Sequence, residues 1–467
     1  MSLRLFAACA ILLTTIGRAS PQTLASHQQL AFDIFKELVE INTVVGIGDT
    51  ARAAEAMAAR LRTAGFGGAD VQVLVSAPRK GNLVARLRGT GKRRPILLLA
   101  HIDVVDAKRE DWSVDPFRLT ERDGYFYGRG TTDNKFMAAA FVANLIRYKQ
   151  EGYTPDRDII VALETDEEIL DAYGMGIRWL LANHRPLIDA EFALNEGGRV
   201  GLKGGKPVWN SVQVSEKVIV SYKLEVRDKG GHSSLPTKDN AIYRLAEGLV
   251  RLSRFGFPFK LSDTTRMFFL RAAETESPQT AADMRAIVAG RPELETLAIT
   301  RLSANPFYNA QLRTTCVATQ LEGGHAVNAL PQMARATVNC RVLPGEPIAE
   351  VEATLKRVLA DDRISITQLG MPGQSPPSAL HGEVMAAIER LSAEFWPGVP
   401  VIPIMSPGAT DSAYLRNAGI PAYGHSGLAD DVDDFRAHGK DERVPVKSFH
   451  DGHEYLYRLV KSLSGQG

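Results

Sequence analysis

Apolar runs and amphipathic stretches alternate along the first half of the chain. Strands are predicted for the apolar runs at 70–75, 82–88, 95–100, 158–163 and 190–194. Helices are predicted at 28–41, 51–65, 135–150 and 174–184. The run 95–100 is apolar at almost every position, which is typical of a central strand that is buried on both faces. The alternation therefore predicts an α/β fold in which helices cover both faces of a sheet.

The pattern changes near residue 215. Two β-rich runs, "TTCVATQLEG" and "ARATVNCRVLPG", predict an antiparallel pair of strands, with helices at 238–254 and 347–360. The long stretch from 255 to 310 mixes polar and apolar residues without a clear period. This part of the chain is predicted to be an α+β module inserted into the first domain.

The first pattern returns after a segment rich in proline, glycine and serine at 371–379, as expected of a linker. Helices are predicted at 381–394, 411–418 and 445–463, and a strand at 400–405. We therefore divide the chain into a leader at 1–20, a first domain formed by 21–214 and 373–467, and an inserted module at 215–372.

The N-terminus has the order of a secretory signal. Arg4 precedes the apolar run 5–16, which is followed by the segment "GRAS" with its small residues, and the run is too short to span a bilayer comfortably. We therefore expect an exported protein, periplasmic or secreted, that is not membrane-bound in its mature form. Lysine plus arginine number 55 and aspartate plus glutamate 54, which argues against a nucleic-acid binder.

Two cysteines, Cys316 and Cys340, follow the leader, and both lie in predicted strands of the inserted module. An exported protein can join them as a disulfide. Buried free thiols fit the sequence equally well, because the pattern does not show whether their Cα atoms approach each other.

Acidic and histidine side chains follow the predicted strands. His101 and Asp103 come directly after 95–100, and residues two apart lie on one face of an extended chain. Glu167 and Glu168 come just after 158–163, and both can serve one site only if the strand has already ended. Because ligands bind at the carboxyl ends of strands in α/β sheets, this edge is the candidate site.

Three further groups extend the cluster: Asp133 in "YGRGTTDNK", Glu196 in "LNEGG" and His438 in "AHGKDER". Alone, Asp133 could equally be a helix N-cap. His450 and His453 are the alternatives to His438 as the last metal ligand. Carboxylates and imidazoles without thiolates suit zinc, manganese or cobalt. Five ligands with one shared suit two ions about 3.5–4 Å apart.

These motifs resemble those of the di-zinc metallopeptidases that include aminoacylases, glutamate carboxypeptidase and Gly-X carboxypeptidase, over nearly the whole mature chain. The resemblance implies a mixed-sheet catalytic domain with an inserted lid and dimerisation domain. It also implies two zinc ions. His101 and Glu196 would hold one ion, Glu168 and His438 the other, and Asp133 would bridge them.

The same resemblance assigns roles around the metals. Asp103 would support His101, Glu167 would be the general base, and His232 in "GGHSS" would stabilise the oxyanion, often across a dimer interface. The substrate would be held by Asn328, Arg341 and Gly408. Asn134 departs from the family, which commonly has a second aspartate there.

A guanidinium fork such as that of Arg341 suits a substrate carboxylate. The expected function is therefore metal-dependent hydrolysis of an amide bond next to a free carboxylate, as in a carboxypeptidase or dipeptidase. An N-acyl amino acid hydrolase and an aminopeptidase are the alternatives on this site. A non-catalytic binding protein would have lost the base or a ligand, and this chain keeps both.

Overall fold

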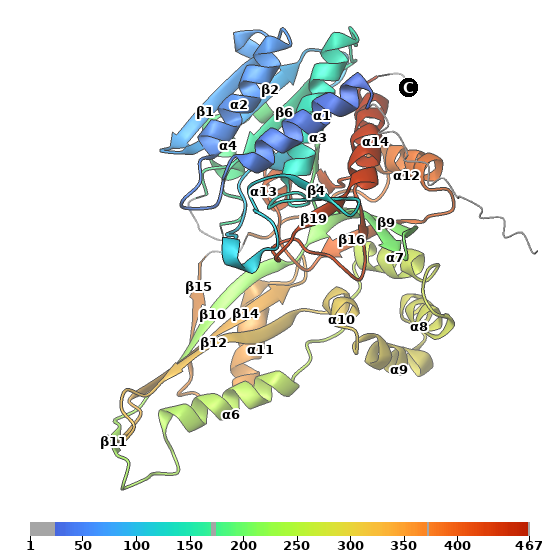
Figure 1. The fold of residues 1–467 in the computed structure, drawn as a ribbon. Coiled ribbons are helices and arrows are strands. Elements are labelled where there is room, and N and C mark those ends of the chain that lie inside the picture. Colours follow the sequence, from blue (N-terminus) through green and yellow to red (C-terminus); the bar gives the residue numbers. More distant parts are fainter. Residues whose placement is uncertain (1–23, 170–173, 371–372, 466–467) are drawn as a thin grey trace, which may run out of the picture.

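The computed structural model describes residues 24–169, 174–370 and 373–465. The predicted leader at 1–20 lies outside the described residues, as do residues 371 and 372 of the predicted linker. Two sheets dominate the fold (Figure 1). We call the larger one the catalytic sheet and the smaller one the lid sheet.

The catalytic sheet is mixed and has ten strands. In spatial order they are β1 (Val71–Ala77), β2 (Lys80–Leu87), β6 (Ile159–Glu164), β3 (Ile96–His101), β7 (Phe192–Asn195), β17 (Ala422–Gly424), β9 (Lys206–Glu216), β8 (Val200–Lys203) and β18 (Ala429–Asp431), with β16 (Val401–Ser406) beside β9. Strands β6, β3, β7 and β17 run parallel. As predicted, the run at 95–100 is an inner strand, and every residue of β3 is buried.

Helices cover both faces of this sheet, which confirms the predicted α/β architecture. One face carries α1 (Ser26–Glu40), α2 (Thr50–Thr63), α3 (Lys135–Gln150), α12 (Glu383–Phe395) and α14 (Val446–Ser464). The other carries α4 (Ile177–Asn183), α5 (Arg185–Ile188) and α13 (Ser412–Asn417). Alternate residues of β3 divide between the two cores, Leu98 on the first face and Leu97 and Leu99 on the second, because successive strand residues point to opposite faces.

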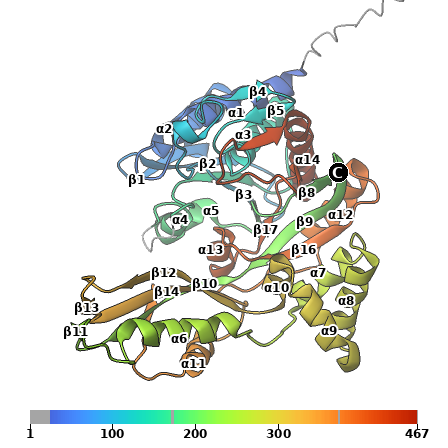
Figure 2. The same cartoon turned by 60° about the horizontal axis from the view of Figure 1, so that its bottom comes forward.

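The lid sheet has four antiparallel strands. Their order is β12 (Thr315–Gly323), β14 (Met333–Val342), β10 (Val218–Arg227) and β15 (Ser365–Leu369). Helices α6 (Ala241–Arg254) and α11 (Ile348–Leu359) cover one face, and a short pair, β11 (Gly231–His232) and β13 (Ala329–Leu330), lies at the far end (Figures 1 and 2). β12 and β14 are the predicted antiparallel pair.

Short elements complete the described fold. They are the 3-10 helices Gly68–Asp70 and Arg109–Asp111, and a small sheet of β4 (Thr120–Arg122), β5 (Tyr125–Tyr127) and β19 (Arg443–Pro445). β9 ends at Glu216 and β10 begins at Val218, so the chain passes from one sheet to the other at Lys217.

The stretch from 255 to 310, to which no elements were assigned, contains four helices. They are α7 (Asp263–Ala272), α8 (Pro278–Ala289), α9 (Pro292–Leu302) and α10 (Pro306–Leu312), and we call residues 263–312 the helical insert. Three of these helices begin with proline, which fits the first turn because its missing N–H has no intrahelical partner there. The Ser277-Pro278 and Asn305-Pro306 pairs were therefore the features of the sequence that indicated the starts of α8 and α10.

Cys316 and Cys340 are joined by a disulfide in the structure. They stand directly opposite each other on β12 and β14. This settles the alternative that the sequence left open. In the part of the chain that the structure describes, no helix is both long enough and apolar enough to cross a bilayer.

Candidate metal centre

Three adjacent parallel strands end at one edge of the catalytic sheet, and each brings a candidate ligand there. β3 lies between β6 and β7. His101 is the last residue of β3, Glu196 follows β7 directly, and Glu167 and Glu168 come shortly after β6. This is the edge at which α/β sheets bind ligands.

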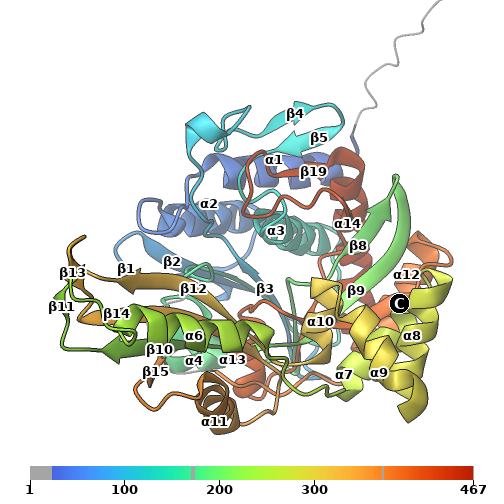
Figure 3. The ribbon, with the colours of Figure 1, turned by 90° about the horizontal axis from the view of Figure 1, so that it is seen from below.

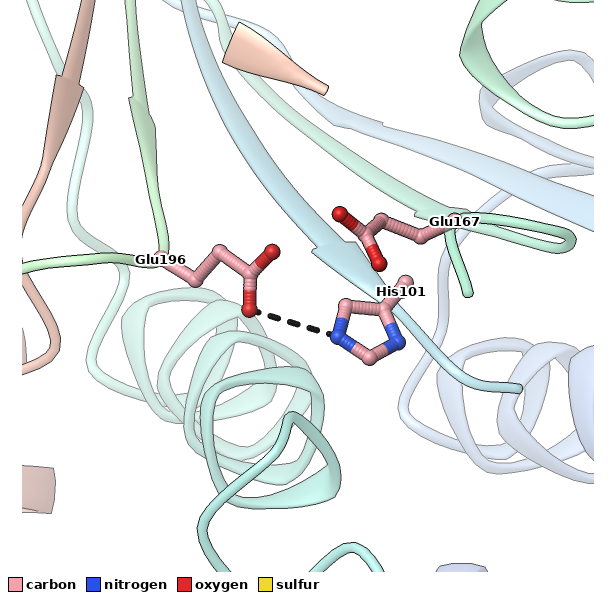
Figure 4. A group of neighbouring side chains, drawn as sticks. All are labelled: His101, Glu167 and Glu196. Carbon is pink, nitrogen blue, oxygen red and sulfur yellow. Dashed lines mark hydrogen bonds and ion pairs between the residues drawn. The ribbon is translucent and has the colours of Figure 1, made fainter. Parts of the chain in front are cut away.

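Asp133 lies between two histidines and offers one oxygen to each. His101 Nε2 lies 3.0 Å from Asp133 Oδ1. It also lies 3.3 Å from Glu196 Oε2 (Figure 4). His438 Nε2 lies 3.1 Å from Asp133 Oδ2 and 3.0 Å from Glu168 Oε1. The five predicted ligands thus form one continuous chain of contacts, with the aspartate in the middle.

The backbone carbonyl of Asp103 orients the imidazole of His101. His101 Nδ1 lies 3.0 Å from this oxygen, whereas the nearest carboxylate oxygen of Asp103 is 3.7 Å away. A proton on Nδ1 leaves the Nε2 lone pair free for a cation. The carboxylate of Asp103 instead accepts the N–H groups of Glu167 and Glu168, at 3.3 and 3.1 Å. Asp103 therefore positions three candidate residues rather than one.

Glu167 and Glu168 face the same site although they are neighbours in sequence. β6 ends at Glu164, and Asp166 has a φ of 68°, so the strand alternation is broken before the pair. Glu168 reaches His438, whereas Glu167 groups with His101 and Glu196, their ligand atoms lying within 4.8 Å of one another (Figure 4).

Burial is the largest cause of the pKa shifts of Glu167 and Glu196. It raises the pKa of the Glu167 carboxyl well above its usual value, and the Glu196 charge adds to the effect. It also raises the pKa of Glu196 to about 7, although His101 opposes the shift. Hydrogen bonds to Asp133 and Glu168 raise the pKa of the His438 imidazole to about 10.

The donor set fits divalent cations. The chain brings together imidazole nitrogens and carboxylate oxygens, with two overlapping groups of three that share His101. Among the described residues, Asp133, Glu168 and Glu196 form ion pairs only with the histidines His101 and His438. Partly buried carboxylates without a lysine or arginine partner fit a site where a bound cation supplies the balancing charge.

The competing histidines lie elsewhere. His453 is buried on α14 and stacks on His27, and His450 is on the same helix. Neither lines the cavity that contains His438.

Glu442 is a buried residue that motif reasoning did not select. Its carboxylate accepts the N–H groups of Gly130, Thr132 and Asp133, at 2.9, 2.8 and 3.1 Å. It also pairs with Arg129, whose Nη1 lies 2.8 Å away. Glu442 therefore ties the loop of Asp133 to the segment that carries His438. Its position in the "HGKDER" motif, four residues after His438, was the feature of the sequence that pointed to a role near the site.

Arg341 and Gly408 line the same cavity as the metal-ligand candidates. The cavity has a volume of about 2030 Å³ and lies between the two sheets and the helical insert. Arg341 is on β14, and its guanidinium donates to Asn339 Oδ1 at 3.1 Å and to the carbonyl of Pro407 at 3.4 Å. Glu216 accepts the N–H of Thr410, which holds the loop containing Gly408.

His232 and Asn328 are not brought to the metal ligands within one chain. His232 is on β11, paired with β13, at the far end of the lid sheet (Figures 1 and 3). Both side chains are exposed, and the carbonyl of Asn328 accepts the N–H of Ser233 at 3.0 Å. Neither residue lines the cavity.

Comparisons with known proteins agree on one family. The model of "Peptidase family M20/M25/M40" matches residues 97–462. The human N-fatty-acyl-amino acid synthase/hydrolase PM20D1 is 30% identical over 377 residues, which are 79% of this chain and 74% of that protein.

Solved structures share the fold. An M20 family metallo-carboxypeptidase from Sulfolobus solfataricus has a TM-score of 0.69 and 18% identity, over 92% of this chain and 98% of that one. The Bacillus subtilis YXEP protein, described as a dinuclear metal-binding peptidase of the M20 family, has a TM-score of 0.60 and 14% identity, over 94% and 99% of the chains.

We expect Glu442→Gln to loosen the loop that carries Asp133. Arg129 would lose its buried charge partner, which costs about 3–5 kcal/mol of the free energy of unfolding. Metal affinity should fall about 10- to 100-fold, because groups that orient ligands contribute on this scale. Urea unfolding and metal titration measure the two effects.

Glu394→Gln is the matched control, because Glu394 forms a half-exposed ion pair with Arg458. Its effect on stability should stay below about 1 kcal/mol. Unchanged metal affinity in Glu442→Gln would show that this carboxylate does not position Asp133.

Proposed function

The chain belongs to peptidase family M20/M25/M40, and on this basis we propose that it is a zinc-dependent hydrolase of N-acyl amino acids. The family and its relatives establish a metallohydrolase of amide bonds, with carboxypeptidases and N-acyl amino acid hydrolases among its members. The similarity to PM20D1 supports an N-acyl amino acid over a dipeptide.

The observation that carries the proposal is the shared position of Asp133 between His101 and His438. His101, Asp133 and Glu196 would hold one ion, and Asp133, Glu168 and His438 the other. Two divalent ions in these positions would polarise the scissile carbonyl and acidify the attacking water. Zinc suits this mixture of imidazole and carboxylate ligands.

Glu167 is proposed as the general base. Its carboxylate groups with His101 and Glu196, whereas His438 forms its ion pairs with Asp133 and Glu168. A buried carboxylate with a raised pKa can take a proton from the attacking water and pass it to the leaving nitrogen.

Arg341 is proposed to bind the substrate carboxylate. It lines the cavity together with the ligand candidates, and Gly408 lies in the loop that it contacts. Its planar fork can donate two parallel hydrogen bonds to a carboxylate.

His232 and Asn328 are proposed to act in a neighbouring copy of the chain. β12 is an edge strand of the lid sheet, and its Val317 and Leu321 side chains are 61% and 72% exposed. Tyr243 adds exposed apolar surface on α6. An edge strand with exposed apolar residues is a ready site for pairing between two chains. A dimer through this surface would carry His232 to the partner's cavity.

Export is also part of the proposal. The leader-like N-terminus and the Cys316–Cys340 disulfide both suit an oxidising compartment such as the periplasm or the cell exterior.

Glu167→Gln should retain its metal and lose turnover. Removing a general base lowers kcat by about 10²- to 10⁴-fold, whereas the amide keeps the size of the side chain. Metal analysis and steady-state kinetics on an N-acyl amino acid test this. Glu168→Gln is the contrasting variant, because we expect its metal content to fall, whereas that of Glu167→Gln should not. Near-normal turnover in Glu167→Gln would remove this residue from the chemistry.

A free carboxylate on the substrate should be required. Amidating it removes the partner of Arg341, and hydrogen bonds to charged groups contribute about 1.5–3 kcal/mol. We therefore expect kcat/KM to fall about 10- to 100-fold, and Arg341→Met to cause a similar loss with the free acid only.

Arg335→Met is the control for this experiment, because Arg335 is on the same strand and pairs with Glu322 at the surface. This variant should leave kcat/KM unchanged for both the free-acid and the amidated substrate. Cleavage of amidated substrates with a free amine, and of these alone, would indicate an aminopeptidase.

Mixing two inactive variants tests the dimer. Glu167→Gln lacks the base, and His232→Ala lacks the group that the partner would supply. Each should be inactive alone. In random heterodimers one of the two sites regains both groups, so mixing should restore about a quarter of the wild-type activity. Leu321→Lys should block this rescue, and no rescue from stable dimers would place His232 outside the partner's site.

A further inference from the structure

The helical insert packs on the catalytic sheet although it is inserted within the lid sequence. It lies beside β9 and β16, apart from the lid sheet (Figures 1 and 3). Ile402 of β16 is buried among its apolar residues, with Trp209 and Ile404 packed against the same cluster. Gln311 donates to the carbonyl of Met405 at 2.8 Å, and both groups are buried.

The insert therefore forms a wall that is fixed relative to the metal-ligand edge. Its own core is built from Phe268, Phe269, Met284, Leu302 and Leu312. Motion of the lid sheet would leave this wall in place.

The cavity at the metal-ligand edge continues to this wall. Its apolar and aromatic lining there comes from Trp209, Ile404, Phe268, Leu302, Phe307 and Tyr308. The volume of about 2030 Å³ exceeds the roughly 300–1,000 Å³ of an ordinary small-molecule pocket. An amino acid bound near Arg341 leaves most of this space free.

Local structure fixes the two aromatic residues at the end of the insert. Asn305 caps α10, and its side chain accepts the N–H groups of Phe307 and Tyr308 at 2.9 and 3.2 Å. Phe307 packs edge-on against Phe268, and Tyr308 donates to Glu276 at 2.6 Å. Phe307 nevertheless remains 41% exposed, so its ring keeps a free face although it packs against Phe268.

We propose that the helical insert binds the acyl half of the substrate, and that Phe307, Tyr308 and Trp209 make the site selective for long apolar acyl chains. The inference rests on the proposed N-acyl amino acid hydrolysis. It adds the surface that determines the preference for the length of the acyl chain. Carboxylate recognition at Arg341 on the lid sheet and acyl recognition on the insert then use separate walls of one cavity. A small acyl group would not reach the insert.

The test compares acetyl, octanoyl, lauroyl and palmitoyl derivatives of one amino acid. In the wild type, kcat/KM should rise with chain length. Phe307→Ala removes apolar contact area, and it should lower kcat/KM about tenfold for the long chains only. Phe307→Trp narrows the groove and should shift the preference to shorter chains.

Leu297→Ala is the matched control. Leu297 is also in the insert and is 59% exposed, but it lies outside the cavity lining. It should leave the dependence on chain length unchanged. An equal loss for acetyl and palmitoyl substrates in Phe307→Ala would overturn the assignment, as would the same loss in Leu297→Ala.

Binding of laurate to the full-length protein gives a second readout that does not depend on turnover. Titration calorimetry should show about tenfold weaker binding to Phe307→Ala than to the wild type or Leu297→Ala. Equal affinity for all three proteins would reject the insert as the acyl wall. Failure to hydrolyse any N-acyl amino acid, with laurate binding intact, would instead reject the proposed reaction and keep the apolar site.

Discussion

Several buried carboxylates share one edge of the catalytic sheet, and the repulsion between them is the constraint on which the rest of the site depends. Asp133, Glu168 and Glu196 lie within hydrogen-bond distance of the His101 or His438 imidazole. Glu167 joins them, with a carboxylate oxygen within 4.8 Å of the ligand atoms of His101 and Glu196. In a medium of low polarity such charges strongly disfavour one another unless positive charge is present. Burial raises the pKa values of Glu167 and Glu196, and the neighbouring negative charges raise them further. A pair of cations turns the same arrangement from a destabilising feature into a binding site.

The main features of the fold could be predicted because they follow from simple periodicity. The strand at 95–100 is buried on both faces, and its uninterrupted apolar run indicated this. The helical insert was missed for a different reason. Its helices have 7 to 12 residues, and they bury their apolar residues against one another and against Ile402 and Trp209, which are distant in sequence. A pattern read within one helix carries little information about such a contact, although the prolines at the helix starts marked the boundaries.

The candidate site shows the same division between local and distant information. Residues that follow strands could be selected from sequence, because the end of a strand fixes their location. That Asp103 supports His101 was expected, but the atoms involved were not. Its carbonyl oxygen faces His101, while its carboxylate accepts two backbone N–H groups from the segment that follows β6. Glu442 illustrates the point most clearly. The loop that it organises is about three hundred residues away in sequence, and only the folded chain shows that these groups meet.

The contacts of the insert also restrict where the lid sheet can rotate relative to the catalytic sheet. The lid sheet is joined to the catalytic sheet at Lys217, which is buried and donates to the carbonyl of Arg313 at 2.6 Å. Arg313 follows the insert and in turn donates to the carbonyl of Phe257, which precedes it. Both covalent connections between lid and insert are therefore tied to the crossing point between the sheets. If the lid rotates, a pivot at this junction would let Arg341 approach or leave the metal-ligand edge while the insert keeps its place beside it. The second connection between the sheets runs from β15 to α12.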